Sequence, residues 1–284
     1  MNRLSIILPA KNEAPALTGL LPALRAAQPE AEIIVVDDGS TDDTRAICAA
    51  NGVQCLSSPY SMGNGAAIKR GTRAATGDIL VFMDGDGQHA PADVARLLAE
   101  LDRGYDMVVG ARDWSSQAGV GRGMANNLYN WVATRMTGHQ VADLTSGFRA
   151  VRADKFREFL YLLPNGFSYP TTSTMAFFRN AYPVAYLPIK AAQRIGKSHI
   201  RPLRDGLRFL LIIFKIATLY SPLKLFVPAS AVFFLLGCAN YLWTYFHFGR
   251  LTNGSTLLWS AAVIIFLIGL ISEQITALTY RRDD

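Results

Sequence analysis

Two long apolar runs near the C-terminal end restrict the fold of this 284-residue chain more than any other feature. Residues 225–246 carry no charged side chain, and residues 257–278 carry only Glu273. Each run is long enough to cross a bilayer as a helix, and only ten residues separate the two. Two buried core helices are the alternative, but core helices rarely lack charge over ~20 residues. The pattern therefore predicts an antiparallel transmembrane hairpin.

Basic residues are distributed unevenly around these runs. The loop between the runs carries only Arg250, whereas both outer flanks are basic. The positive-inside rule then places both termini at the cytoplasmic face of the cell (inner) membrane. Residues 4–8 are too short for a cleavable signal peptide. The flanking basic residues are Arg201, Arg204, Arg208, Lys215 and Lys224 before the first run, and Arg281 and Arg282 after the second.

The stretch at residues 199–223 alternates basic and very apolar side chains. Such a pattern predicts amphipathic helices in the headgroup region, so the net charge of +6 favours a membrane surface over nucleic acid as the partner. We expect three parts: a catalytic domain (1–198), interfacial helices (199–223) and the hairpin (224–284).

Glu273 lies near the cytoplasmic end of its run, where an interfacial or inter-subunit contact is expected, and a homo-oligomer could form through the hairpin.

The N-terminal part alternates predicted strands and helices. This alternation is typical of a parallel, Rossmann-like α/β domain, in which ligands bind at the carboxyl ends of the strands. No GxGxxG or Walker motif is present, so a dinucleotide cofactor and P-loop chemistry have no support. Strands are expected at 4–8, 33–36, 53–57, 79–83 and 107–109, and helices at 13–27, 65–75 and 91–101, with a further short helix after the second strand.

Two of the predicted strands end in acidic residues. Asp84 and Asp86 follow one apolar strand, and Asp37–Asp38 ends another. Side chains two apart on an extended chain point to the same side, so Asp84 and Asp86 can face one cation. Hard oxygen ligands suit Mg²⁺ or Mn²⁺ held jointly with substrate phosphates, and Gln88 offers a further neutral oxygen. A solvated Asp/Gly turn is the simpler alternative for this motif taken alone.

Five motifs stand in one order along the chain. They are Leu8–Glu13, Val35–Asp42, Met83–His89, Thr145–Arg149 and Arg194–Ser198. Together they resemble family 2 glycosyltransferases, most closely the polyprenyl-phosphate hexosyltransferases of the dolichol-phosphate mannose synthase group. This resemblance implies a GT-A fold, a divalent metal (Mg²⁺ or Mn²⁺), a nucleotide diphosphate sugar as donor and a polyprenyl phosphate lipid as acceptor.

The resemblance also assigns roles to individual residues. It implies that Asp84, Asp86 and Gln88 hold the metal, that Asp38 accepts from the nucleobase and that Glu13 lies near the ribose. His199 replaces the basic residue usual after Ser198. The implied donor-binding residues are Pro9, Glu13, Asp37, Asp38, Asp84, Arg194 and Ser198, and the implied acceptor-phosphate residues are Arg112, Arg122, Asn126 and Arg149.

The chemistry of the acceptor limits what the site must supply. A monoalkyl phosphate has a second pKa near ~6 and arrives ionised, so no general base is needed. We therefore expect single displacement with inversion, driven by positioning and electrostatics. The catalytic set would be Asp84, Asp86, Arg112 and Arg122, with Asp143 modulating the step or, more simply, anchoring Arg149. The helix at 122–136 has an apolar face that either meets the bilayer or packs in the core.

Three alternatives stay open at this point. A processive polysaccharide synthase shares the N-terminal motifs, but the Gln-x-x-Arg-Trp run typical of that class is absent. A non-enzymatic membrane-anchored nucleotide-sugar-binding protein would not need the metal triad beside basic acceptor residues. A lipid flippase is disfavoured because two spans enclose no pathway without oligomerising. Neither the sugar nor the nucleotide can be read from the sequence.

Overall fold

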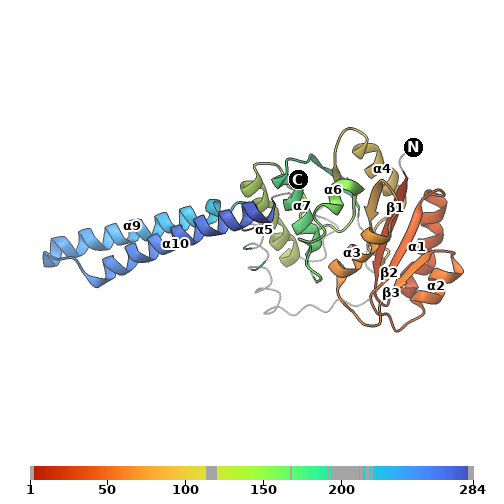
Figure 1. Cartoon of the computed structure of the whole chain (residues 1–284), viewed down its shortest axis with the longest axis horizontal. Coiled ribbons are helices and arrows are strands. Elements are labelled where there is room, and N and C mark those ends of the chain that lie inside the picture. The colour runs from red at the N-terminus through yellow and green to blue at the C-terminus, as the bar shows by residue number, and fades with distance from the viewer. Residues whose placement is uncertain are drawn as a thin grey trace. The chain divides into compact units, whose positions relative to one another are not determined.

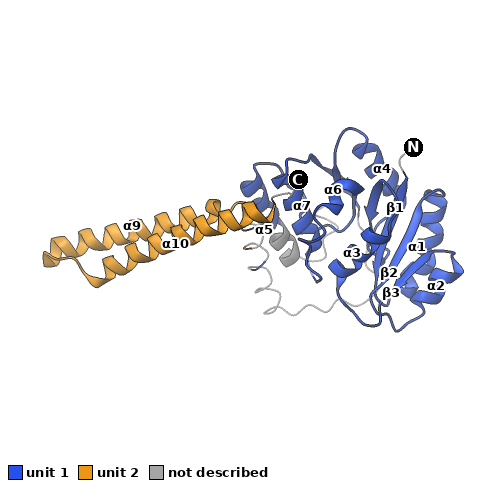
Figure 2. Cartoon of the chain, in the orientation of Figure 1, with its two compact units in different colours: residues 1–212 blue, residues 213–284 orange. Residues whose placement is uncertain are grey.

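The chain forms two compact units, residues 1–212 and residues 213–284 (Figure 2). The computed structural model describes residues 3–112, 120–166, 168–190, 192, 211, 214, 218 and 220–280, with side chains in the helix that begins at 120 described from residue 127 onward. The domain boundaries expected at residues 198 and 223 stay a prediction.

The first unit is built on a seven-stranded sheet with the order β3-β2-β1-β4-β6-β5-β7. Figure 1 labels its strands β1, β2 and β3. All neighbouring strands run parallel except β6, which is antiparallel to both β4 and β5. The strands are β1 (Leu4–Ala10), β2 (Glu32–Asp37), β3 (Gln54–Ser57), β4 (Ile79–Phe82), β5 (Met107–Arg112), β6 (Arg149–Arg152) and β7 (Val184–Ile189).

Helices cover both faces of this sheet. On one face, Leu17 of α1 and Val94 of α4 join strand residues such as Val35 in a single buried core. On the other face, α3 packs so closely that a Cβ on Gly71 would lie 2.4 Å from Cγ2 of Ile7. The helices of this unit are α1 (Ala14–Ala27), α2 (Thr44–Ala50), α3 (Asn64–Ala74), α4 (Ala92–Leu101), α5 (Val120–Thr137), α6 (Ala153–Arg157) and α7 (Tyr169–Arg179).

The predicted α/β architecture is confirmed, and all five predicted strands are present. Strands β6 and β7 were not predicted. In β6 the sequence Arg-Ala-Val-Arg gives two apolar residues between two charged ones, which is neither an alternating pattern nor an apolar run. The antiparallel strand pairs Phe82 of β4 with Arg149, and so brings the Thr145–Arg149 motif beside the acidic end of β4.

The second unit contains two antiparallel helices, α9 (Leu223–Phe248) and α10 (Asn253–Thr279). Both are long and apolar enough to cross a membrane, and each extends beyond its predicted run by only a few residues. Their contact is tight at two glycines, because a Cβ on Gly237 would lie 2.6 Å from the Trp259 ring and one on Gly269 would lie 2.6 Å from Phe226. Small residues that allow this close approach are typical of helix pairs in membranes.

Glu273 joins the two helices at one end of the hairpin. Its Oε2 accepts hydrogen bonds from the Ser221 hydroxyl (3.1 Å) and the Leu223 backbone N–H (3.2 Å) at the start of α9. A carboxylate at a helix N-terminus satisfies backbone donors and complements the helix dipole. Glu273 therefore has a partner within its own chain, while the inter-subunit contact and the homo-oligomer stay predictions.

Candidate active site

A cavity of about 420 Å³ lies at the carboxyl ends of β1, β2 and β4. Because these three strands are parallel neighbours, their ends and the loops that follow meet at one edge of the sheet. Asp38, Asp84 and Asp86 all line it, as the sequence predicts for a cleft shared by two acidic strand ends. The full lining consists of Pro9, Ala10, Lys11, Glu13, Asp38, Ser61, Gly63, Asn64, Ala67, Asp84, Gly85 and Asp86.

The two carboxylates after β4 form the acidic end of this cavity. A Cβ on Gly85 would lie 3.1 Å from the Pro9 carbonyl oxygen and 3.3 Å from Cβ of Ala10, so the turn between the acids packs against the end of β1. Asp86 accepts the Gln88 backbone N–H at 3.2 Å. Within the part of the chain that the structure describes, no group of three or more His, Cys, Asp or Glu side chains could hold an ion. Two carboxylates beside a cavity fit a Mg²⁺ or Mn²⁺ ion that takes its other oxygens from substrate and water.

Gln88 is directed toward a different part of the chain. Its side-chain Nε2 donates to the Ala192 carbonyl at 3.3 Å, and its backbone carbonyl accepts the Ala192 N–H at 2.9 Å. Gln88 is not among the residues that line the cavity. The predicted third metal ligand thus anchors residue 192 in this structure.

Asp38 holds the loop that forms the far wall of the cavity. Its Oδ1 accepts the Met62 N–H at 2.6 Å, and its Oδ2 accepts the Ser61 hydroxyl at 2.6 Å and the Gly63 N–H at 3.0 Å. Both carboxylate oxygens are therefore bonded to this loop. The predicted contact with a nucleobase would have to share them.

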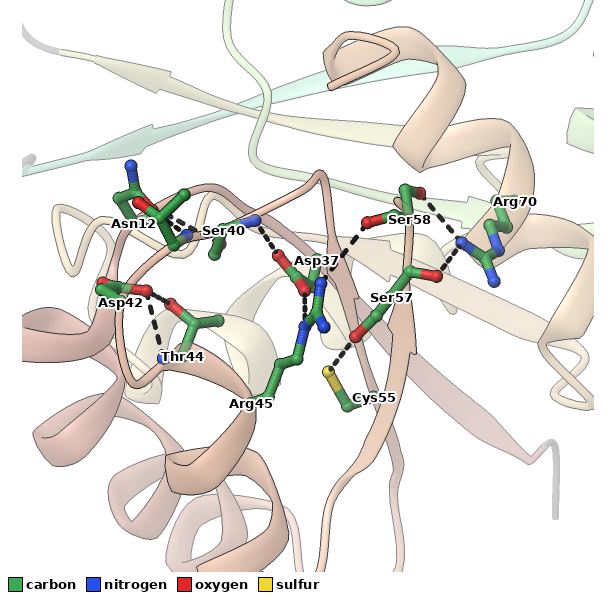
Figure 3. Close-up of polar contacts among 11 residues, drawn as sticks. Asn12, Asp37, Ser40, Asp42, Thr44, Arg45, Cys55, Ser57, Ser58 and Arg70 are labelled. Atoms are coloured by element: carbon green, nitrogen blue, oxygen red, sulfur yellow. Dashed lines mark hydrogen bonds and ion pairs between the residues drawn. The ribbon is translucent and has the colours of Figure 1, made fainter. Parts of the chain in front are cut away.

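Asp37 faces away from the cavity into a separate polar network (Figure 3). Its carboxylate accepts the Ser40 N–H at 2.7 Å and pairs with Nε of Arg45 at 2.6 Å. Burial raises the pKa of Asp37, but the hydrogen bonds from Ser40 and Arg45 outweigh it, so the net pKa lies below the ordinary value. Arg45 also donates to the Ser58 carbonyl at 3.4 Å, which ties β2, α2 and the loop after β3 together.

Arg112, at the end of β5, forms a two-pronged ion pair with Asp143. Nε donates to Oδ2 at 2.7 Å and Nη2 to Oδ1 at 3.0 Å, and Nη2 also donates to the Thr145 hydroxyl at 2.8 Å. Asp143 is fully buried. Its burial raises its pKa, but the bonds from Arg112 outweigh this and lower it overall. The carboxylate therefore anchors Arg112, not Arg149.

The charges around Arg112 connect it to the acidic end of the cavity. Burial lowers its pKa, but Asp143 and, more weakly, Asp84 raise it, so the net pKa lies above the ordinary value. The turn at 145–147 links the two groups, because Arg112 donates to the Thr145 hydroxyl and a Cβ on Gly147 would lie 3.0 Å from Oδ2 of Asp84. The predicted acceptor arginine and the predicted metal carboxylate are brought together.

Arg149 lies beneath the site and does not line the cavity. It is 0 % exposed and donates to the Pro170 and Ser146 carbonyls and to the Ser173 hydroxyl. It therefore supports the turn that follows Ser146, where a Cβ on Gly147 would lie 3.0 Å from Asp84. In this arrangement its side chain has no route to an acceptor phosphate.

Four predicted residues cannot be placed. Arg194 and Ser198 lie outside the described residues, as do the side chains of Arg122 and Asn126. Farther along α5 the predicted apolar face divides, because Met136 is buried whereas Leu128 and Trp131 are exposed. Core packing is therefore confirmed for Met136, while contact of the exposed residues with the bilayer stays a prediction.

Three polar residues of the cavity have no role assigned by the sequence. Lys11, Ser61 and Asn64 line it; Ser61 comes from the loop between β3 and α3, and Asn64 is the first residue of α3. The only signal there was the Gly-rich turn at 61–65 before a helix, which alone does not indicate a ligand. His89, from the third motif, is buried and stacked on Phe148, and burial lowers its pKa to about 4.

Comparisons with known proteins agree with this architecture. The model of glycosyl transferase family 2 matches residues 5–160, and that of the GtrB C-terminal hairpin matches residues 221–278. An undecaprenyl-phosphate mannosyltransferase of Micrococcus luteus is 32% identical over 212 residues, covering 69% of this chain and 86% of the relative. An undecaprenyl-phosphate 4-deoxy-4-formamido-L-arabinose transferase of Proteus mirabilis is 32% identical over 162 residues, covering 54% of this chain and 49% of the relative. The chain thus spans about half the length of several curated relatives that it matches.

Solved structures share the fold of the first unit. Glucosyl-3-phosphoglycerate synthase from Mycobacterium tuberculosis in complex with Mg²⁺ and uridine diphosphate aligns with a TM-score of 0.62 at 22% identity, covering 76% of this chain and 79% of that one. The same enzyme with Mn²⁺, uridine diphosphate and glucosyl-3-phosphoglycerate gives a TM-score of 0.60 at 24% identity, covering 76% and 78%. The predicted GT-A-like fold is confirmed.

Proposed function

Because the chain belongs to glycosyltransferase family 2, we propose that it is a membrane-bound inverting enzyme that transfers a hexose from a nucleotide diphosphate sugar to a polyprenyl phosphate. One observation carries this proposal: Asp84 lines the cavity and also lies against Gly147, in the turn whose Thr145 hydroxyl accepts a hydrogen bond from Arg112. A site that joins two phosphate-bearing substrates would use carboxylates that can hold a divalent cation next to a fixed guanidinium, and this edge of the sheet offers two carboxylates and the guanidinium that Asp143 fixes.

The donor would occupy the cavity. Asp84 and Asp86 would hold Mg²⁺ or Mn²⁺, whose charge would stabilise the leaving nucleoside diphosphate. Pro9 and Glu13 line the same cavity and would contact the nucleoside. Arg194 and Ser198 complete the proposed donor site through the family motif.

The acceptor phosphate would be received by Arg112, with Arg122 and Asn126 from α5. The bidentate pair with Asp143 fixes the Arg112 guanidinium, so little conformational freedom is lost when it meets an anion. The phosphate arrives ionised and attacks without a general base, while the guanidinium offsets the repulsion between the two anions. We keep Asp143 as a positioning residue and leave Arg149 out of the acceptor site.

The hairpin would keep the enzyme at the membrane where the lipid acceptor resides. Two apolar helices and the match to the GtrB hairpin indicate a membrane protein. Its proposed orientation, with both termini in the cytoplasm, follows from the basic flanks. A reporter fused after Asp284 should then be cytoplasmic and one inserted at 249–255 exported; two reporters on the same side would refute the hairpin topology.

The function is tested by a donor screen in detergent. Radiolabelled nucleotide sugars are incubated with undecaprenyl or dolichyl phosphate and Mg²⁺ or Mn²⁺, and the organic phase is counted. We expect one donor to give a single lipid-linked monosaccharide and chelation to abolish the product. A polymeric product would favour the processive synthase, and metal-independent binding without turnover would favour the non-enzymatic alternative.

A further inference from the structure

The turn at residues 145–147 lies against the acidic end of the cavity. A Cβ on Gly147 would lie 3.0 Å from Oδ2 and 3.4 Å from Oδ1 of Asp84, so both oxygens of this carboxylate border the glycine. Asp84 also lines the cavity. A shift of the turn would therefore change the space that the Asp84 carboxylate can occupy, and with it the direction in which its oxygens face the cavity.

Two guanidinium groups hold the first two residues of this turn. Nη2 of Arg112 donates to the Thr145 hydroxyl at 2.8 Å. Nη2 of Arg149 donates to the Ser146 carbonyl. Both groups are held in turn, Arg112 by its ion pair with Asp143 and Arg149 by hydroxyl and carbonyl groups of α7. The turn is therefore fixed from the side of the protein core.

A tyrosine holds the third residue of the turn. Tyr169, the first residue of α7, donates from its hydroxyl to the Gly147 carbonyl at 2.8 Å and is only 2 % exposed. Its ring centroid lies 6.0 Å from that of Phe82 and 5.7 Å from Cζ of Arg149, so packing fixes the ring. The hydroxyl oxygen would lie 3.3 Å from a Cβ on Gly147. The phenol and the Asp84 carboxylate thus border the same side of this glycine.

We propose that Tyr169 is a positioning residue for the cation site: its hydroxyl holds the Gly147 carbonyl, and the turn so fixed keeps the Asp84 carboxylate in place for a divalent ion. This inference rests on the proposed function, because it takes Asp84 and Asp86 to be the ion's ligands. Groups that orient a ligand raise the affinity for the ion, since the ligand loses less freedom on binding. Tyr169 lies outside the five sequence motifs.

Two other tyrosines provide matched controls, because Tyr→Phe removes only a hydroxyl. The Tyr182 hydroxyl donates to Oε2 of Glu158 at 2.8 Å. The Tyr186 hydroxyl, on β7, is buried and has no hydrogen-bond partner within the described part of the chain. Neither residue lines the cavity. One control therefore loses a hydrogen bond away from the site, and the other loses a hydroxyl that makes none.

The test is a titration of the full chain in detergent with Mn²⁺ alone, in which free Mn²⁺ is measured by electron paramagnetic resonance. Tyr169→Phe should weaken Mn²⁺ binding by roughly five- to tenfold, the low end for partners of metal ligands, because the hydroxyl acts through the turn. Tyr182→Phe should lower the melting temperature and leave Mn²⁺ binding unchanged. Tyr186→Phe should change neither quantity.

A further variant reaches Asp84 from the glycine. Gly147→Ala places a methyl group against the carboxylate and should also weaken Mn²⁺ binding. If the wild type binds no Mn²⁺, or if Asp86→Asn binds it as tightly as the wild type, the cation site of the proposed function fails. If Asp86→Asn loses the ion but Tyr169→Phe keeps the wild-type affinity, the cation site stands and this inference is wrong. Equal losses in Tyr169→Phe and Tyr182→Phe would also overturn it, because they would reflect general destabilisation.

Discussion

The two units use apolar side chains in opposite ways. In the first unit, residues such as Leu8 and Val81 are fully buried between the sheet and its helices. In the hairpin, residues such as Leu235, at 65 % exposed, point outward, and only 6% and 17% of the apolar windows of α9 and α10 are buried. One region excludes water by packing against itself, and the other matches an apolar solvent, so similar residues contribute to stability by different routes.

The two helices of the hairpin must therefore be held together by close backbone approach and interhelical hydrogen bonds, and not by the exclusion of water. The helices approach closely at Gly237 and Gly269, and the Ser230 hydroxyl donates to the Ala262 carbonyl at 2.8 Å. In the first unit, burial stabilises the fold, and polar residues at the carboxyl ends of the strands remain available for chemistry.

The largest expected effect concerns the polar edge of the first unit. Asp86→Asn keeps the size of the side chain but removes a carboxylate from the proposed cation site, so turnover should fall by ~10² or more with Mg²⁺ or Mn²⁺ present. The melting temperature should change little, because the residue lies at the sheet edge and not in the core. Near-normal activity of Asp86→Asn would show that the metal assignment is wrong.

A matched pair of leucines compares the two regions directly. Leu8→Ala empties space in the core and should cost about 2–5 kcal/mol of unfolding free energy. Leu235→Ala leaves no cavity inside the protein and should cost less than about 1 kcal/mol in detergent, since lipid or detergent fills the space. Denaturant titrations of both variants measure this; equal losses would mean that Leu235 is buried, for instance against another copy.

The hydrogen bonds that Glu273 accepts from Ser221 and Leu223 should contribute a smaller amount to the stability of the hairpin. Glu273→Leu removes the acceptor at the start of α9 and should destabilise the hairpin by about 1 kcal/mol, measured by unfolding in mixed micelles. Glu273→Gln retains an acceptor oxygen and serves as the control. A loss of catalytic-unit stability in Glu273→Leu would contradict the assignment of this residue to the hairpin alone.

The smallest effect concerns Asp37 and depends on pH. Its pKa is lower in the folded chain than in the unfolded one, so its stabilising contribution is complete above the unfolded pKa of about 3.9 and is lost as the pH falls through the folded value. Asp37→Asn should therefore melt below the wild type at pH 7, and the gap should close under acidic conditions. A gap that is constant with pH would exclude the ionised carboxylate as its cause.

Much of the fold could be predicted because its signals are local. Apolar runs that end in acids locate β2 and β4, and uncharged runs locate α9 and α10. The antiparallel β6 could not be found, because its four residues are stabilised by pairing with β4 and β5 and not by their own pattern.

The site was predicted in part for a similar reason. Asp84 and Asp86, two apart, share one side, whereas consecutive residues such as Asp37 and Asp38 point in opposite directions, so only one lines the cavity. Arg149 follows the turn at 146–147 and starts a buried strand, which directs its side chain beneath the site. The segment that carries Asn64 is held by hydrogen bonds from Gly65 and Ala66 to residues 165 and 166, about a hundred residues away, and no local pattern reveals these contacts.

We propose that this site joins two anions without a general base. The most direct measurement compares undecaprenyl phosphate with undecaprenol as acceptors at equal concentration, with the donor identified by the screen and Mg²⁺ present. We predict transfer to the phosphate and none detectable to the alcohol, because the alcohol must lose a proton and carries no charge for Arg112 to hold. Comparable transfer to undecaprenol would contradict the account.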